Sequence, residues 1–310
     1  MTFVLDRNIY LTNICVSECG FCAFSRREDH PEAYTLSRGE VLQKIRELAD
    51  SGGTQVLIQG GLNPELRLGD YEDLIRAIRK NFPGIRIHSF SPPEVDMLAQ
   101  VEKMSYREVL LRLKSAGLAS LPGGGAEILV ERVRKIVSPR KISAKNWLEV
   151  MRVAHGLGLK ATATMVFGHV ETFRERILHL VKIRKLQDET QGFRAFIPWS
   201  LCPQGTPGLS RLAMTGGEDY LRMIAISRLF LDNIPNIQAG WVTEGHALAQ
   251  VALEFGANDM GGVLMEERVI SPTGVCFQTR LADMLRLIRN AGYLPAQRDT
   301  SYEILREFRR

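Results

Sequence analysis

The chain has 310 residues, of which 45% are hydrophobic and 24% charged, an ordinary globular composition that argues against intrinsic disorder. Its formal net charge of +5 is spread along the chain, and no aromatic residues alternate with a basic stripe, so we expect no nucleic-acid surface. Residues 1–10 lack the apolar core of a signal peptide and no apolar run approaches a membrane span, so we expect a cytoplasmic protein without membrane contact.

Strand patterns and helix patterns alternate along the whole chain. The predicted strands cover residues 8–13, 55–59, 85–90, 118–121, 161–167, 194–201, 237–242 and 262–265. The predicted helices run from a Ser37 cap to the Gly52-Gly53 pair, and over residues 71–82, 106–116, 145–157, 172–187, 217–233, 245–255 and 281–292. Eight strand-then-helix units without a linker predict an α/β fold, a (β/α)8 TIM-type barrel forming a single domain over residues 1–310.

Three cysteines, Cys15, Cys19 and Cys22, follow the first predicted strand, and Gly20 leaves the loop room to wrap tightly around a metal centre. A cluster of four irons needs four ligands, so three cysteines leave one iron open for a small molecule. The spacing, with the aromatic Phe21 before the last cysteine, resembles the radical S-adenosylmethionine (SAM) superfamily. This resemblance implies a radical SAM fold and a 4Fe-4S cluster whose open iron chelates SAM.

Other interpretations of the cysteines are less favoured by the sequence. A structural zinc site requires a fourth Cys or His at ligand spacing, and none follows in the chain. Three unrelated buried cysteines in one loop are less favoured still. Because the total of five cysteines is odd and three share one loop, a secreted disulfide framework is not expected either.

The chemistry of such barrels gathers at the carboxyl ends of the strands, so residues that follow the other strands should surround the cysteine loop. Gly60 and Gly61 follow the second strand, and the resemblance implies contact with the SAM amino group; alternatively, the pair forms a helix-start turn with positive φ. Glu127 follows the Gly123–Gly125 run and either accepts from the SAM ribose or amino group or is a solvated glutamate at a helix start.

The segment after the fifth strand contains Gly168, His169 and Glu171, and it resembles the superfamily's Gly-x-x-Glu segment, whose backbone flanks the adenine. Glu171 precedes Thr172 and suits a structural cap. His169 suits either proton transfer or a structural hydrogen bond.

Further polar and aromatic residues lie beside the remaining strands and complete the expected ring. They are His88, Ser89, Trp199, Trp241, Thr243, Asn258 and Asp259. The two tryptophans offer flat faces for an aromatic substrate, although plain core packing is an equal alternative. Cys202 and Cys276 lie far from the triad in sequence, and we interpret them as small hydrophobes or surface thiols.

Several longer segments refine the resemblance, which covers nearly the whole chain. They are residues 6–9, 12–24, 59–64, 88–92, 124–129, 167–172 and 256–259. These segments look like the group of radical SAM enzymes that contains dehypoxanthine futalosine cyclase, aminofutalosine synthase and the deazaflavin-precursor synthases. Phe196-Ile197-Pro198-Trp199 most resembles the cyclases of the futalosine route to menaquinone.

The resemblance implies that the reduced cluster splits SAM and that a 5′-deoxyadenosyl radical takes a hydrogen from the substrate ribose. The ribose radical then adds to the benzoate ring, and loss of an electron and a proton yields the cyclic product. His88, His169 or Glu171 would accept that proton. Expected partners are a nucleoside-derived aromatic substrate and a reductant such as flavodoxin or ferredoxin.

Three other functions stay open at this point. A sister radical SAM enzyme would act on another aromatic acid. A non-catalytic iron-sulfur electron carrier would be reduced reversibly without cleaving SAM. A zinc-dependent barrel hydrolase would contain zinc and no sulfide.

Overall fold

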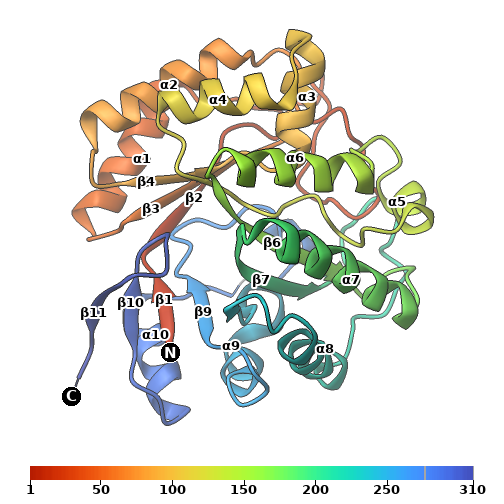
Figure 1. The fold of residues 1–310 in the computed structure, drawn as a ribbon, viewed down its shortest axis with the longest axis vertical. Helices are drawn as coiled ribbons and strands as arrows, with labels where there is room; N and C mark the ends of the chain where they lie inside the picture. The colour runs from red at the N-terminus through yellow and green to blue at the C-terminus, as the bar shows by residue number, and fades with distance from the viewer. Residues whose placement is uncertain (276, 310) are drawn as a thin grey trace.

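The computed structural model describes residues 1–275 and 277–309, and a parallel sheet of seven strands forms its centre (Figure 1). The spatial order of these strands is their order in the chain: β2 (Asp6–Tyr10), β3 (Gln55–Gln59), β4 (Arg86–Ser89), β5 (Ser120–Leu121), β6 (Lys160–Phe167), β7 (Phe193–Ser200) and β8 (Asn236–Ile237). Every neighbouring pair is parallel, as repeated strand-helix units require.

The helices lie on the outside of the curved sheet (Figure 1). They are α1 (Arg38–Asp50), α2 (Leu68–Asn81), α3 (Pro92–Glu102), α4 (Tyr106–Ala116), α5 (Glu131–Val137), α6 (Ala144–Gly156), α7 (Phe173–Thr190), α8 (Gly217–Phe230) and α9 (Trp241–Ala252). The chain also forms α10 (Leu281–Asn290) and the 3-10 turn η1 (Ser271–Thr273). Ser37, Ser105 and Thr172 begin α1, α4 and α7 with capping boxes.

A second sheet joins the two edges of the first. It has the order β11 (Ile304–Glu307), β10 (Ala296–Arg298), β1 (Thr2–Val4), β9 (Asp259–Gly262). Only Leu5 separates β1 from β2, β9 runs parallel to β1, and Gln238 beyond β8 forms a parallel bridge with Asp259. The predicted barrel-type α/β fold is therefore confirmed, with seven strands as a half-barrel and the eighth, β9, in the second sheet.

The local structure differs from the sequence analysis in two places. The strand expected over residues 237–242 ends at Ile237, and α9 begins at Trp241, whose indole nitrogen donates to the Gly262 carbonyl at 2.9 Å. A tertiary contact thus overrides the strand preference of this segment. The sequence analysis also lacks a helix over residues 92–102, where Pro92 and Pro93 form the first turn of α3, a position at which a missing N–H costs nothing.

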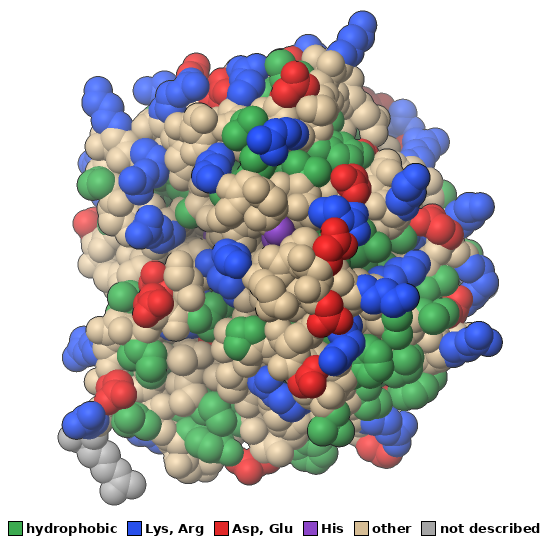
Figure 2. All heavy atoms as spheres, in the orientation of Figure 1, with side chains coloured by type: hydrophobic (Ala, Val, Ile, Leu, Met, Phe, Trp, Pro, Cys, Tyr) green, Lys and Arg blue, Asp and Glu red, His purple; other side chains and the backbone are tan. Residues whose placement is uncertain are grey.

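The outer surface carries mixed charge. Figure 2 shows Lys and Arg side chains scattered over one face among Asp and Glu, as expected for solvated surface. Among the described residues, no helix is both long and apolar enough to cross a membrane.

Candidate active site

The cysteine loop follows β2 and lies at the carboxyl end of the sheet. Its backbone is fixed by hydrogen bonds from Cys15 N to the Arg26 carbonyl at 3.0 Å and from Gly20 N to the Val137 carbonyl at 2.9 Å. Cys15, Cys19 and Cys22 all line one cavity of about 290 Å³. The loop therefore presents its three sulfurs to a common space.

Gly60 and Gly61, after β3, permit the close approach of this loop. A Cβ on Gly61 would lie 2.1 Å from the Ile14 carbonyl oxygen and 2.9 Å from the Cys15 Cβ. A Cβ on Gly60 would lie 2.7 Å from the Thr12 carbonyl oxygen. Neither glycine has positive φ, so the pair is required by backbone proximity and not by a left-handed turn.

The donor set fits an iron-sulfur cluster better than a single ion. No group of three or more His, Cys, Asp or Glu in the described ranges is arranged to hold one metal ion. A cuboidal cluster instead spreads its cysteine sulfurs over separate irons, which suits three thiols distributed around one cavity. Burial raises the pKa of the Cys19 thiol while Lys141 opposes that shift, so ligation must displace a proton.

Glu127 is buried beside this cavity, which contradicts the alternative of a solvated glutamate at a helix start. Its side chain is 3% exposed, and α5 begins only at Glu131. Lys141 Nζ lies 2.7 Å from Glu127 Oε1, and Arg134 lies 3.6 Å from Oε2. Burial opposes ionisation, but these two cations outweigh it and lower the pKa of Glu127. Glu127 thus stands ionised at the cavity wall.

Lys141 is a residue that the sequence analysis missed. It lines the cavity, and its ammonium group lies 5.1 Å from the centre of the Phe21 ring. Phe21 also lines the cavity, next to Cys22 in the chain. The sequence carries no signal for Lys141, because it follows α5 in a connection that resembles any other basic surface segment.

The polar groups of the segment after β6 bind one another. Gly168 N and His169 N donate to Glu171 at 2.7 and 2.9 Å, and Arg176 pairs with the same carboxylate at 2.8 Å. Burial by itself would raise the pKa of Glu171, but the hydrogen bonds from His169 and Gly168 outweigh it and lower the pKa to about 2. Glu171 closes the loop and does not line the cavity. Its role is structural, but the cap of α7 is formed by Thr172 with Glu175 and not by Glu171.

His169 is held in the same loop. Its ring packs between the Val166 carbonyl, 2.9 Å from Nε2, and Glu171, 2.8 Å from Nδ1, and its side chain is fully buried. His169, Glu171 and Gly168 do not line the cysteine cavity, and they do not line the inner cavity described below. Val166 of β6 does line the cysteine cavity. The expectation that His169 and Glu171 face the substrate therefore lacks geometric support.

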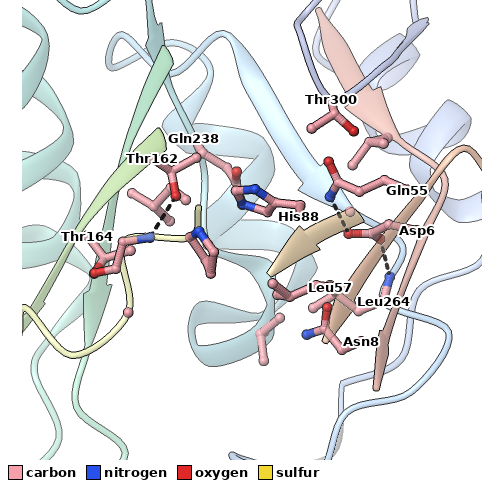
Figure 3. Close-up of a pocket in the computed structure, with 18 of the residues that line it drawn as sticks. Asp6, Asn8, Gln55, Leu57, His88, Thr162, Thr164, Gln238, Leu264 and Thr300 are labelled. Carbon is pink, nitrogen blue, oxygen red and sulfur yellow. Dashed lines mark hydrogen bonds between the residues drawn. The ribbon is translucent and has the colours of Figure 1, made fainter. Parts of the chain in front are cut away.

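A second, inner cavity of about 160 Å³ lies inside the barrel below the cysteine cavity. Figure 3 shows His88, Thr162, Asp6 and Gln55 around it, with Gln55 donating to Asp6 at 3.4 Å. Asn8, Gln59, Thr164 and Trp199 line both cavities, so the two are adjacent.

Of the remaining predicted residues, His88, Trp199 and Trp241 line the inner cavity. Ser89 does not; its hydroxyl accepts from Ile58 N at 3.1 Å within the sheet. His88 Nδ1 lies 2.7 Å from the Ser120 hydroxyl, and burial together with nearby arginines lowers the pKa of His88 well below its usual range. His88 is therefore neutral.

Asn258 and Asp259 are wrongly placed by the sequence analysis. Asp259 begins β9 and is therefore at its amino end, where Arg298 pairs with it through two hydrogen bonds at 2.5 and 3.0 Å. Asn258 accepts from Arg228 at 2.8 Å and from Ile237 N at 2.9 Å. Neither lines a cavity.

Two more cavity residues lacked a clear sequence signal. Glu94 caps α3 through Ser91, lines the cysteine cavity, and has a pKa raised to about 7 by burial. Cys202 is a buried thiol that lines the same cavity, so it is not a surface thiol. Cys276 lies outside the described residues.

Comparison with known protein families and relatives gives matches along the whole chain. The model of the radical SAM superfamily matches residues 9–182, and that of the CofH/MqnC C-terminal region matches residues 190–309. A relative from Halalkalibacterium halodurans named cyclic dehypoxanthine futalosine synthase is 49% identical over 99% of this chain and 83% of its own length. A protein of the same name from Streptomyces coelicolor is 44% identical over 98% of this chain and 76% of its own length. The aminodeoxyfutalosine synthase of Thermus thermophilus is 41% identical over 98% and 83%.

Solved structures support the fold alone. Methylornithine synthase (PylB) superposes with a TM-score of 0.73 at 19% identity, covering 94% of this chain and 83% of its own. The FeFe-hydrogenase maturase HydG from Carboxydothermus hydrogenoformans gives a TM-score of 0.75 at 18% identity, covering 97% and 69%.

Proposed function

The chain belongs to the radical SAM superfamily, and we propose that within it the protein converts dehypoxanthine futalosine to cyclic dehypoxanthine futalosine in menaquinone biosynthesis. The observation that carries this proposal is the 49% identity to a synthase of that name over 99% of the chain. Relatives of other names, such as the aminodeoxyfutalosine synthase at 41%, are less similar. The enzyme is a radical SAM oxidoreductase that uses a 4Fe-4S cluster and SAM.

Cys15, Cys19 and Cys22 would hold the cluster. When bound, the cluster and SAM supply a radical that removes a hydrogen atom from the substrate. Glu127 and Lys141 stand at the wall of the same cavity with opposite charges, suited to the polar groups of SAM. The glycine pair keeps the cysteine loop against the sheet. SAM and substrate bound in the cavity would displace water that would otherwise quench a radical.

Of the three candidate proton acceptors, we favour His88, because it lines the inner cavity. When Nδ1 carries the proton and donates to Ser120, Nε2 is free to accept the proton released from the substrate ring. A His88→Gln variant should form deoxyadenosine from SAM at the normal rate and cyclic product several-fold more slowly. An unchanged rate of product formation would exclude this role.

We further propose that residues 1–310 act as one domain, because one hydrophobic cluster includes both Phe3 and Ile288. A small one-electron carrier such as flavodoxin or ferredoxin would reduce the enzyme. The thiols that bind a cluster must stay reduced, which favours the cytoplasm.

The test is anaerobic reconstitution with iron and sulfide, followed by SAM, reductant and dehypoxanthine futalosine. We expect cyclic product and deoxyadenosine in the wild type, and neither in Cys15→Ala, Cys19→Ala or Cys22→Ala. Tyrosine with 5-amino-6-(D-ribitylamino)uracil serves as the comparison substrate, because relatives named for that transfer are 41% to 43% identical. Turnover of that pair alone would reassign the protein to a sister activity, and cluster reduction without SAM cleavage would indicate an electron carrier.

A further inference from the structure

The inner cavity contains a guanidinium group that neither the cluster nor SAM requires. We propose that Arg194, on β7, binds the carboxylate of the aromatic acid substrate inside the barrel. This inference rests on the proposed function and assigns the acidic end of its substrate to a specific residue. Arg194 lines the inner cavity, within the part of the chain that matches the CofH/MqnC C-terminal region.

Three buried polar atoms around this one cavity have no hydrogen-bond partner in the described part of the chain. They are Arg194 Nε, Asn8 Oδ1 and Thr300 Oγ1. They come from β7, from β2 and from the connection between β10 and β11, so the fold brings them together from distant parts of the sequence. Buried donors and acceptors are almost always paired in native proteins. Their convergence therefore indicates a polar ligand in this space.

The charge of Arg194 favours an anion as that ligand. Arg298, the other arginine lining the cavity, is neutralised by two hydrogen bonds to Asp259. Arg194 instead donates to the neutral carbonyl oxygen of Thr300. The nearby Asp299 carboxylate already accepts from two backbone amides, those of Ser301 and Glu303.

Burial lowers the pKa of Arg194 to about 10, so its guanidinium is still charged at neutral pH. A carboxylate that reaches the Arg194 guanidinium from the cavity would form a charge-assisted hydrogen bond.

The walls of the cavity suit the aromatic ring that carries the carboxylate. Trp199 and Trp241 offer apolar faces. Leu57 adds a further apolar group, and His88 and Thr162 add neutral polar groups (Figure 3). Because the inner cavity adjoins the cysteine cavity, an aromatic acid anchored at Arg194 would direct the rest of the molecule toward the cysteine cavity. Arg194 is thus a positioning residue for the substrate.

The test compares benzoate with the neutral benzamide as probes, titrated into the reconstituted enzyme and followed by ligand-observed NMR. A hydrogen bond to a charged group predicts that the wild type binds benzoate about 10- to 100-fold more tightly than benzamide. Arg194→Met should abolish this preference. Arg194→Lys, which keeps a cation but loses the planar fork, should reduce it about 3- to 10-fold.

Arg184→Met is the control for loss of an arginine outside the cavities, because Arg184 donates to the Phe230 carbonyl, pairs with Asp232 and lines neither cavity. It should keep the wild-type preference. The proposal is overturned if the wild type shows no preference, or if folded Arg194→Lys or Arg194→Met retains it in full. A wild type that prefers benzoate but makes no cyclic product would reject the proposed function while leaving the carboxylate site in place.

Discussion

The contact between Gly61 and the cysteine loop allows a quantitative test of how the cluster site is built. In Gly61→Ala the new Cβ would lie 2.1 Å from the Ile14 carbonyl oxygen, whereas ordinary contact begins at 3.4 Å, so the loop must retreat by about 1.3 Å. That retreat strains the hydrogen bonds from Gly61 N to Thr12 at 2.8 Å and from Val16 N to Leu62 at 3.0 Å. Overpacking costs about 1–3 kcal/mol, and each lost hydrogen bond adds about 1 kcal/mol.

We therefore expect Gly61→Ala to lose about 2–5 kcal/mol of the stability of the loaded site. The assay is iron and sulfide content per chain after anaerobic reconstitution, together with deoxyadenosine formation. Gly60→Ala should lose less, because its closest contact is longer at 2.7 Å. Gly69→Ala, in α2 with no atom within 4 Å of the new Cβ, is the control and should match the wild type. Full cluster content in Gly61→Ala would refute this steric account.

Three further variants test other parts of the site. Lys141→Met leaves the buried Glu127 with only the longer Arg134 contact and should lower the urea midpoint of unfolding by the equivalent of about 3 kcal/mol. Adding Glu127→Gln to this variant should restore most of the lost stability. A double variant as unstable as Lys141→Met alone would contradict the pairing of Lys141 with Glu127. Burial raises the pKa of Asp6 to about 6, so its ionisation destabilises the fold increasingly as pH rises from about 4 to 6. Asp6→Asn should therefore be more stable against unfolding than the wild type by up to about 3 kcal/mol at pH 8, and by little at pH 4. A difference in urea midpoints that does not change with pH would contradict this prediction. Gly168→Ala places a side chain on a residue with a backbone φ of +87° and brings its Cβ against Thr215. The melting temperature should fall by the equivalent of about 1–3 kcal/mol. An unchanged melting curve would count against strain at this turn.

The site could be predicted from the sequence wherever its residues are close together in the chain. The three cysteines lie in one loop, and the strand over residues 55–59 was predicted with the bounds that β3 has, because a short apolar run between glycines is a local signal. The helix over residues 106–116 and the Ser37 cap of α1 are local in the same sense. Such features depend on backbone preferences that neighbouring residues share.

Only the tertiary structure decided which distant side chains meet. Lys141 pairs with Glu127 and Arg194 faces the inner cavity because separate elements bring them there. Trp241 begins a helix because its indole binds Gly262, and Asp259 lies at the amino end of β9 because it pairs with Arg298. Burial and pairing between residues far apart in the chain set these positions and charge states, and neither can be deduced from residue type or local spacing.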